Sequence, residues 1–339
     1  MSLIVTNKYT LIVGLGLTGV SAARYLLAQG MRVVACDSRL NPPNLQQVKD
    51  HLPKLAIELG EFDEDLFLHA EEIIISPGFA RKSPVIQKAL AAGVSVIGDV
   101  ELFARAVNAP VIAITGSNGK STVTRLVGEM AKEANINVGV AGNIGLPVLD
   151  ALSDEVELYV LELSSFQLES TQSLKPVVAT VLNVSADHMD RYNSFIEYAL
   201  TKQRIAFGAG TVVVNKQDPL TEPPIADGVK RLCFTAGHPD LNDYGLNDSF
   251  LVKGFEKLVN VNELNIVGQH NLMNACAALK IDSCPMEGFE AAKYNEILGL
   301  TERGLSAALV CPIGYRSEED QTQHGKKVRK PLTEMFEVV

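Results

Sequence analysis

The sequence predicts an α/β protein that contains two parallel-sheet domains in succession. Short β-branched runs alternate with helical stretches over most of the 339 residues, as in repeated strand–helix–strand units. Runs such as LIV and III are apolar on both faces, as parallel strands between two helical layers must be. Two glycine-rich phosphate-type motifs each follow a strand. We therefore expect an N-terminal Rossmann-like domain at 1–97 and a central P-loop ATPase-like domain at 98–280.

The expected elements of the two domains follow one another in the same alternating pattern. In the first domain, a strand at 10–14 leads through a glycine motif into an amphipathic helix at 18–30, and further strands are predicted at 32–37, 72–78 and 94–98. In the second domain, a strand and glycine motif at 111–122 are followed by strand regions at 157–165, 177–185 and 211–215.

Composition and charge exclude several classes of protein. Hydrophobic residues make up 47% and charged residues 21% of the chain, so disorder over most of its length is excluded. The net charge of −10 argues against general binding to nucleic acid or to an anionic membrane. No apolar run is long enough to span a bilayer, and the N-terminus does not resemble a signal peptide. The five scattered cysteines form no CxxC pair, which favours a reducing cytoplasm over disulfides or structural zinc.

The first glycine motif is a GxGxxG between a strand and a helix: Gly14-Leu15-Gly16-Leu17-Thr18-Gly19. Glycines at these positions permit a tight turn and a close approach of the backbone to a phosphate at the helix N-terminus. Asp37 ends the next strand, where an acidic residue often binds a ribose hydroxyl. From these residues alone NAD, FAD or a UDP-sugar could be the ligand, and a glycine turn without any ligand is the structural alternative.

The second motif, Thr115-Gly116-Ser117-Asn118-Gly119-Lys120-Ser121-Thr122, reads as a shortened P-loop. Its backbone amides are expected to surround the phosphates of ATP, Lys120 to neutralise their charge, and Ser121 or Thr122 to bind Mg²⁺.

Five further residues each have a functional and a structural interpretation. Glu162 ends a strand, where a carboxylate is placed to bind Mg²⁺, although a solvated acid would fit equally well. His188 follows another strand and is a metal ligand, a positioned hydrogen-bond donor or a structural histidine, and Lys202 alone reads as a surface lysine. Asn271 and Asn274 stand at a helix start, where they suit recognition of a base or N-capping.

Taken together, these blocks closely resemble the Mur ligases of the MurD type. GLGLTGVSAARYL, SPG, TGSNGKST, GNIG, LELSSFQLE, NVSADHMDRY and VGQHN occur in the order of that family, and the resemblance covers about residues 5–279. It implies an ATP-dependent UDP-N-acetylmuramoyl-L-alanine:D-glutamate ligase of peptidoglycan precursor synthesis. In such enzymes ATP phosphorylates the alanine carboxylate, and the amine of D-glutamate then attacks the acyl phosphate.

The resemblance also implies roles for individual residues. It makes the first domain a UDP site, to which it assigns Gly14, Leu15, Gly16, Leu17, Thr18, Asp37, Ser38, Ser76, Gly78 and Asn143. ATP would be bound by residues 116–122 with Asn271 and Asn274 at the adenine. Of two expected Mg²⁺ ions, the first would be bound by Ser121 and Glu162 and the second by His188. Lys202 matches the lysine that family members carbamylate, which turns a cation into an anionic metal ligand.

After Leu279 the sequence departs from this family. We find no PHR(F/C)E or DSKATN segment there, so a ligase built in this way lacks the third domain that carries the D-glutamate site. On that expectation ligation is impaired, and D-glutamate as a substrate is in doubt. Instead, a helix at 285–304, a strand at 306–315 and a basic stretch at 324–332 form a short α+β tail. About 60 residues rarely build an independent core.

This tail, at 281–339, resembles the C-terminal end of the FMN-dependent, oxygen-insensitive nitroreductases. Pro285, Glu287 and Gly288 match a flavin-contacting PxEGF segment, and Lys327 and Arg329 match a phosphate-binding K-x-R. The rest of a flavin site is not found, so FMN binding is not expected. The join near residues 277–280 indicates a chimera. The competing hypotheses are a non-catalytic nucleotide-binding scaffold and, from the tail, a flavin reductase.

Overall fold

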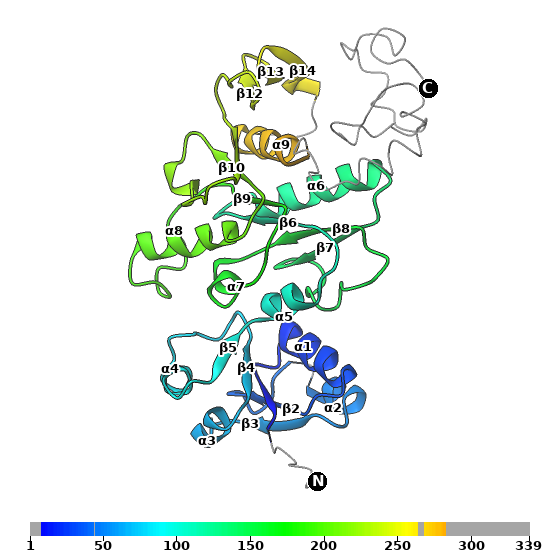
Figure 1. Cartoon of the computed structure of the whole chain (residues 1–339), viewed down its shortest axis with the longest axis vertical. Coiled ribbons are helices and arrows are strands. Elements are labelled where there is room, and N and C mark those ends of the chain that lie inside the picture. Colours follow the sequence, from blue (N-terminus) through cyan, green and yellow to red (C-terminus); the bar gives the residue numbers. More distant parts are fainter. Residues whose placement is uncertain (1–7, 44, 264–267, 283–339) are drawn as a thin grey trace.

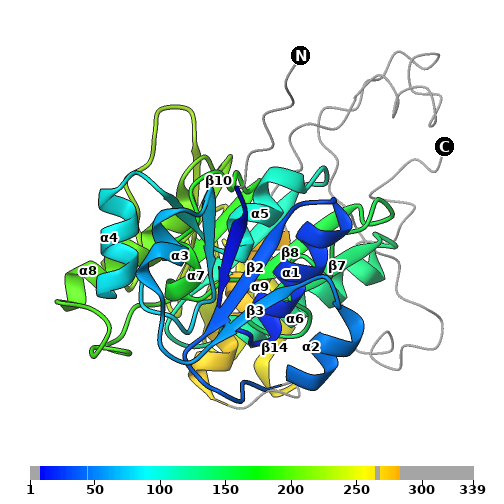
Figure 2. The ribbon, with the colours of Figure 1, turned by 90° about the horizontal axis from the view of Figure 1, so that it is seen from below.

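The computed structural model describes residues 8–43, 45–263 and 268–282. Two α/β domains lie end to end along the long axis of the molecule, and Figure 1 shows the first domain below the central one. Seen from below, in Figure 2, the strands of the first domain lie in front of the central domain. The predicted α/β class is confirmed, with a parallel sheet in the first domain and a mixed sheet in the central one. None of the described helices is both long and apolar enough to cross a lipid bilayer.

The first domain contains a five-stranded parallel sheet with the order β3-β2-β1-β4-β5. Its strands are β1 (Thr10–Val13), β2 (Val33–Asp37), β3 (Ala56–Leu59), β4 (Glu72–Ile75) and β5 (Ser95–Ile97). Its helices are α1 (Leu17–Ala28), α2 (Leu45–His51), α3 (Glu64–Leu68) and α4 (Pro84–Ala91). Strand order reverses between β1 and β4, which is where open α/β sheets bind ligands beyond the carboxyl ends of their strands.

The central domain contains a nine-stranded sheet with the order β14-β13-β12-β11-β10-β9-β6-β8-β7. The parallel part consists of β6 (Val111–Thr115), β7 (Val138–Gly142), β8 (Leu158–Glu162), β9 (Val178–Val181), β10 (Thr211–Asn215) and β11 (Lys230–Phe234). The helices are α5 (Asp99–Ala106), α6 (Lys120–Glu133), α7 (Ser165–Glu169), α8 (Phe195–Gln203) and α9 (Gln269–Asp282), and short 3₁₀ turns lie at Arg204–Ala206, Pro219–Thr221 and Val261–Glu263.

Three further strands, of which the first pairs parallel to β11, extend this sheet and were not predicted from the sequence. They are β12 (Tyr244–Asn247), β13 (Phe250–Lys253) and β14 (Glu256–Asn260), which pair as two hairpins. Asp248, with φ of 52°, and Gly254, with φ of 55°, form the two turns. Positive φ values of this kind suit tight hairpin connections. These strands lie at the top of the molecule in Figure 1, next to α9.

Helix α5 connects the two domains and packs against both. Its Phe103 ring contacts Tyr159 of β8 edge to face, with 5.1 Å between ring centroids. Glu101 is 4% exposed and accepts hydrogen bonds from the backbone amides of Gln172 and Ser173 at 2.7 and 2.9 Å. Arg105 donates to Glu72 of β4 at 2.9 Å. The helix therefore joins the first sheet to the central domain through both apolar and ionic contacts.

Helix α9 spans the place where the sequence predicted a join between two families. Cys276, Ala277 and Ala278 are fully buried, and Ile281 is 2% exposed within the same core. The helix continues without a break to Asp282, so the expected domain boundary at 280 falls inside it. The predicted tail helix and strand lie outside the described residues, as do Pro285, Glu287, Gly288, Lys327 and Arg329.

Candidate active site

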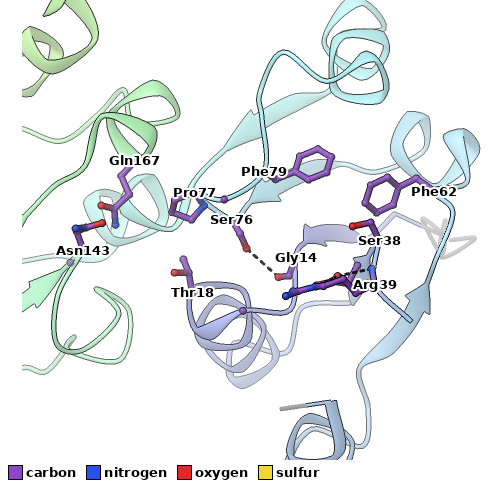
Figure 3. A pocket seen from close by; sticks show the side chains of 14 residues that line it. Gly14, Thr18, Ser38, Arg39, Phe62, Ser76, Pro77, Phe79, Asn143 and Gln167 are labelled. Atoms are coloured by element: carbon purple, nitrogen blue, oxygen red, sulfur yellow. Dashed lines mark hydrogen bonds and ion pairs between the residues drawn. The ribbon is translucent and has the colours of Figure 1, made fainter. Parts of the chain in front are cut away.

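The first cavity lies between the two domains at the carboxyl edge of the first sheet. It has a volume of about 480 Å³. The lining residues from the first domain are Gly14, Gly16, Thr18, Asp37, Ser38, Arg39, Phe62, Ser76, Pro77, Gly78 and Phe79, and those from the central domain are Gly142, Asn143 and Gln167. Figure 3 shows Asn143 and Gln167 facing the glycine loop across this space. Eight of the ten residues predicted to bind the UDP moiety are among these.

The glycine loop is built for a close approach of the backbone to a ligand. Gly14 has φ of 99°, and a Cβ there would lie 2.8 Å from Ser76 Oγ. A Cβ on Gly19 would lie 1.9 Å from the carbonyl oxygen of Gly14, so only glycine lets α1 pack this closely against the turn. The predicted residues Leu15 and Leu17 do not line the cavity. Leu15 is fully buried in the core, and Leu17 is 70% exposed.

Asp37 organises this loop more than the sequence suggested. Its carboxylate accepts hydrogen bonds from the backbone amide of Leu15 at 2.8 Å and from Arg39 Nε and Nη2 at 2.8 and 2.7 Å. The hydrogen bonds from the Arg39 guanidinium are the main cause that lowers the pKa of Asp37 to about 2. Asp37 is therefore an anion that fixes both the turn and Arg39 at the cavity wall.

The P-loop follows β6, as predicted, and α6 begins within the motif at Lys120. Gly119 has φ of 81°, and a Cβ there would lie 2.3 Å from Asn274 Oδ1. Asn183, which follows β9, accepts from the Asn118 amide at 2.8 Å and donates back to the Asn118 carbonyl at 2.9 Å. Ser117 Oγ donates to the Ser185 carbonyl at 2.9 Å. Side chains and carbonyls of the segment that follows β9 thus fix the conformation of the P-loop.

Two lysines converge on one carbonyl of this loop. Lys120 Nζ and Lys202 Nζ each donate to the Gly116 carbonyl at 2.9 Å. Lys202 is only 2% exposed, and its Nζ lies 4.7 Å from the centroid of the Tyr198 ring. Burial, and then the positive charge of Lys120, lower the pKa of Lys202 to about 7. The surface-lysine alternative for Lys202 is therefore wrong.

Glu162 ends β8 beside the P-loop strand and is 1% exposed. Its Oε1 accepts a hydrogen bond from Asn143 Nδ2 at 2.8 Å, whereas its Oε2 is buried without a hydrogen-bond partner. A Cβ on Gly142 would lie 2.1 Å from the Glu162 carbonyl, so glycine is needed where β7 passes this point. A buried carboxylate oxygen without a partner is costly, and a cation beside the P-loop would supply one.

His188 lies on a loop with its backbone in the left-handed region, at φ of 53°. Its side chain is 49% exposed, and Nε2 lies 3.4 Å from Asp187 Oδ2. Its ring packs against Phe166 with 4.8 Å between centroids. Within the described parts of the chain, no three His, Cys, Asp or Glu side chains converge as a ready-made metal site. Any ion here would therefore need ligands from substrate or water as well.

The second cavity, of about 480 Å³, opens on the other side of the P-loop. Its lining residues are Asn118, Gly119, Leu182, Asn183, Asn215, Phe234, His270, Met273 and Asn274. Of the two predicted adenine contacts, Asn274 lines this cavity. Asn271 does not, and its Oδ1 accepts a hydrogen bond from Asn274 Nδ2 at 3.3 Å.

Several residues of the site were missed by sequence reasoning. In the first cavity these are Arg39, Phe62, Pro77, Phe79, Gly142 and Gln167. In the second, the residues that were missed are Leu182, Asn183, Asn215, Phe234, His270 and Met273. Gln167 carried a local signal, because it forms a capping box with Ser164 at the start of α7. Phe62 and Phe234 had none, since no motif surrounds them, whereas Phe79 directly follows the SPG segment.

The comparisons with known proteins agree with this geometry. Residues 8–98 match the Mur ligase MurD-like N-terminal domain, and residues 114–281 match the Mur ligase middle domain. Residues 266–315 match the Nitroreductase family, so the last two matches overlap at residues 266–281, most of which belong to α9.

Relatives with high sequence identity extend the comparison. The UDP-N-acetylmuramoylalanine–D-glutamate ligase of Pseudomonas syringae is 49% identical over 309 residues, which cover 89% of this chain and 69% of the relative. The ligase of the same name from Pseudomonas fluorescens is 47% identical over 331 residues, 96% of this chain and 74% of the relative. Both alignments continue past Leu279, where the motif resemblance was expected to end.

Among solved structures, UDP-N-acetylmuramate:L-alanyl-gamma-D-glutamyl-meso-diaminopimelate ligase from Neisseria meningitides has the same fold. Its TM-score is 0.54 at 17% identity, over 81% of this chain and 92% of the other. With two domain families matched in order and relatives near half identity, this chain belongs to the Mur ligase family, alongside the D-glutamate ligases.

Proposed function

We propose that the chain is an ATP-dependent ligase that activates the alanine carboxylate of UDP-N-acetylmuramoyl-L-alanine for attack by D-glutamate. The observation that carries this proposal is the contact between Asn143 and Glu162. Asn143 lines the first cavity, and its side-chain amide donates to Glu162 beside the P-loop at 2.8 Å. A sugar nucleotide bound in the first cavity would therefore bring its alanine carboxylate next to the phosphates of ATP bound at the P-loop.

Each residue has a role that its surroundings support. The backbone around Gly14 and Gly16 would contact the pyrophosphate of the sugar nucleotide, and the Asp37–Arg39 pair would order the wall around the uridine. Lys120 would move from the Gly116 carbonyl to the ATP phosphates, because a phosphate anion is a far stronger acceptor than a carbonyl. Asn274 would meet the adenine in the second cavity.

Magnesium would neutralise the charge of the phosphates as they approach the substrate carboxylate. Glu162 Oε2 fits this ion because it is buried and has no partner. Ser121 lies in the first turn of α6 and would complete the first site. His188 and a carbamylated Lys202 would hold a second ion, and the pKa of about 7 favours the neutral amine that reacts with CO₂. We further propose that FMN is not bound.

The test is release of ADP from Mg·ATP with and without UDP-N-acetylmuramoyl-L-alanine. ADP release that depends on the sugar nucleotide and is lost in Lys120→Met supports the proposal. Binding of both ligands without turnover would favour the non-catalytic scaffold instead. Adding D-glutamate separates the two halves of the reaction. The expectation of impaired ligation remains a prediction, and a D-glutamate-dependent amide product at ordinary rates would overturn it.

A further inference from the structure

The loop after β4, residues 76–83, lies between the first cavity and the central domain. Ser76, Gly78 and Phe79 line the cavity. On the central-domain side, Arg191 Nη1 donates to the Gly78 carbonyl at 3.4 Å, and Nη2 donates to the Phe79 carbonyl at 3.5 Å. One guanidinium from the central domain thus contacts two consecutive residues of the cavity wall.

The same arginine is joined to the loop that carries His188. Its guanidinium lies over the Phe166 ring at 4.2 Å, and that ring packs against the His188 ring. The Arg191 backbone amide also donates to the His188 carbonyl at 2.9 Å. The Arg191 side chain therefore joins the cavity wall, by a continuous set of contacts, to the loop of the proposed second metal site.

A second tie joins the end of this loop to α8. Lys82 Nζ lies 2.7 Å from Glu197 Oε1, and Glu197 also accepts from the Asn193 amide at 2.8 Å. Helix α8 carries Lys202, which contacts the P-loop at Gly116. The 76–83 loop is thus bound at residues 78–79 and at Lys82 to elements that carry residues of the proposed ATP site.

We propose that Arg191 is a positioning residue that couples occupation of the sugar-nucleotide cavity to the arrangement of the ATP site. This inference rests on the proposed function, because it assigns one ligand to each cavity. A sugar nucleotide that orders the 76–79 wall orders Arg191, and through it the His188 loop. By thermodynamic linkage, if the bound sugar nucleotide raises the affinity for ATP by a certain factor, bound ATP must raise the affinity for the sugar nucleotide by the same factor.

Calorimetry measures this coupling factor as the ratio of two dissociation constants of the sugar nucleotide, without and with an ATP analogue. The dissociation constant of UDP-N-acetylmuramoyl-L-alanine is determined alone and with a saturating non-hydrolysable Mg·ATP analogue. We expect the analogue to tighten binding at least about fivefold in the parent protein. In Arg191→Met the factor should fall below about twofold, while the analogue alone binds within about twofold of the parent. Arg191→Lys keeps the charge and should retain part of the coupling.

The matched control is Arg24→Met, which removes another arginine that bridges the two domains. Arg24 Nη1 lies 2.8 Å from Asp150 Oδ1, and neither residue lines the cavity. The control should keep the full factor. Full coupling in Arg191→Met, or equal loss in Arg24→Met, would overturn the proposal.

Other outcomes separate this inference from the proposed function. If the parent binds both ligands independently, the coupling is absent and the inference fails alone. If the parent binds neither ligand, the proposed function fails as well. Should Arg191→Met not fold, Lys82→Met tests the second tie, and an unchanged coupling factor there would count against the inference.

Discussion

Replacing Lys202 by methionine is expected to stabilise the folded protein at pH 7 and to abolish ATP-dependent activity. Lys202 is 2% exposed, and burial together with the nearby charge of Lys120 lowers its pKa to about 7. Methionine has a similar length, carries no charge and adapts to irregular spaces. The variant therefore removes a group that opposes folding but serves the reaction.

The magnitude follows from the pKa. A value lowered from 10.5 to about 7 corresponds to roughly 5 kcal/mol against folding at neutral pH. Methionine also loses the hydrogen bond to the Gly116 carbonyl, which offsets about 1.5–3 kcal/mol because the donor is charged. The net gain in the free energy of unfolding is then about 2–3.5 kcal/mol, in CO₂-free buffer where Lys202 is an amine.

The pH dependence gives the sharper test. Between pH 7 and 10.5 the unfolded chain binds one more proton at Lys202 than the folded protein, so parent stability rises with pH. The difference between Lys202→Met and the parent should shrink by roughly 1.4 kcal/mol for each pH unit above 7. Urea unfolding at pH 7, 8 and 9 measures it. Thr201→Val, buried on the same helix and without charge, should show a constant difference.

The reasoning is refuted if Lys202→Met is less stable than the parent at pH 7. It is also refuted if the difference between the two proteins does not depend on pH.

Three further substitutions test separate parts of the site. Glu162→Gln keeps an acceptor for the Asn143 amide but loses the negative charge proposed to bind Mg²⁺. ADP release should therefore fall at least about 100-fold while the affinity for the sugar nucleotide is unchanged, and a smaller loss would contradict the metal role. Gly119→Ala, at φ of 81°, should lower stability to urea by roughly 1–3 kcal/mol, and a neutral result would show that the loop relaxes. Asp37→Asn weakens the pairing with Arg39 and should reduce calorimetric affinity for the sugar nucleotide roughly tenfold, but leave affinity for the ATP analogue unchanged.

Both parallel sheets could be predicted because buried parallel strands carry a strong local signal. The strand at 211–215 matches β10 residue for residue. The antiparallel strands β12–β14 were missed because they are only partly buried and contain several charged residues. The turns at Asp248 and Gly254 are their remaining local signal in the sequence.

The candidate site could be predicted where function depends on backbone geometry near a motif. Gly14, Gly119 and Glu162 lie where their spacing placed them. Prediction from the motif failed for Leu15, because its backbone amide donates a hydrogen bond to Asp37 while its side chain is buried in the core. Phe79 reaches the cavity only because β4 lies beside β1 in the sheet, which is a property of topology.

The central claim is that this chain forms an acyl phosphate on its sugar nucleotide, and borohydride trapping tests it most directly. The protein is incubated with Mg·ATP and UDP-N-acetylmuramoyl-L-alanine without D-glutamate, and borohydride then reduces any acyl phosphate to the corresponding alcohol. The account predicts an alaninol product that requires ATP and disappears in Lys120→Met. ADP release without any trapped alcohol would contradict it.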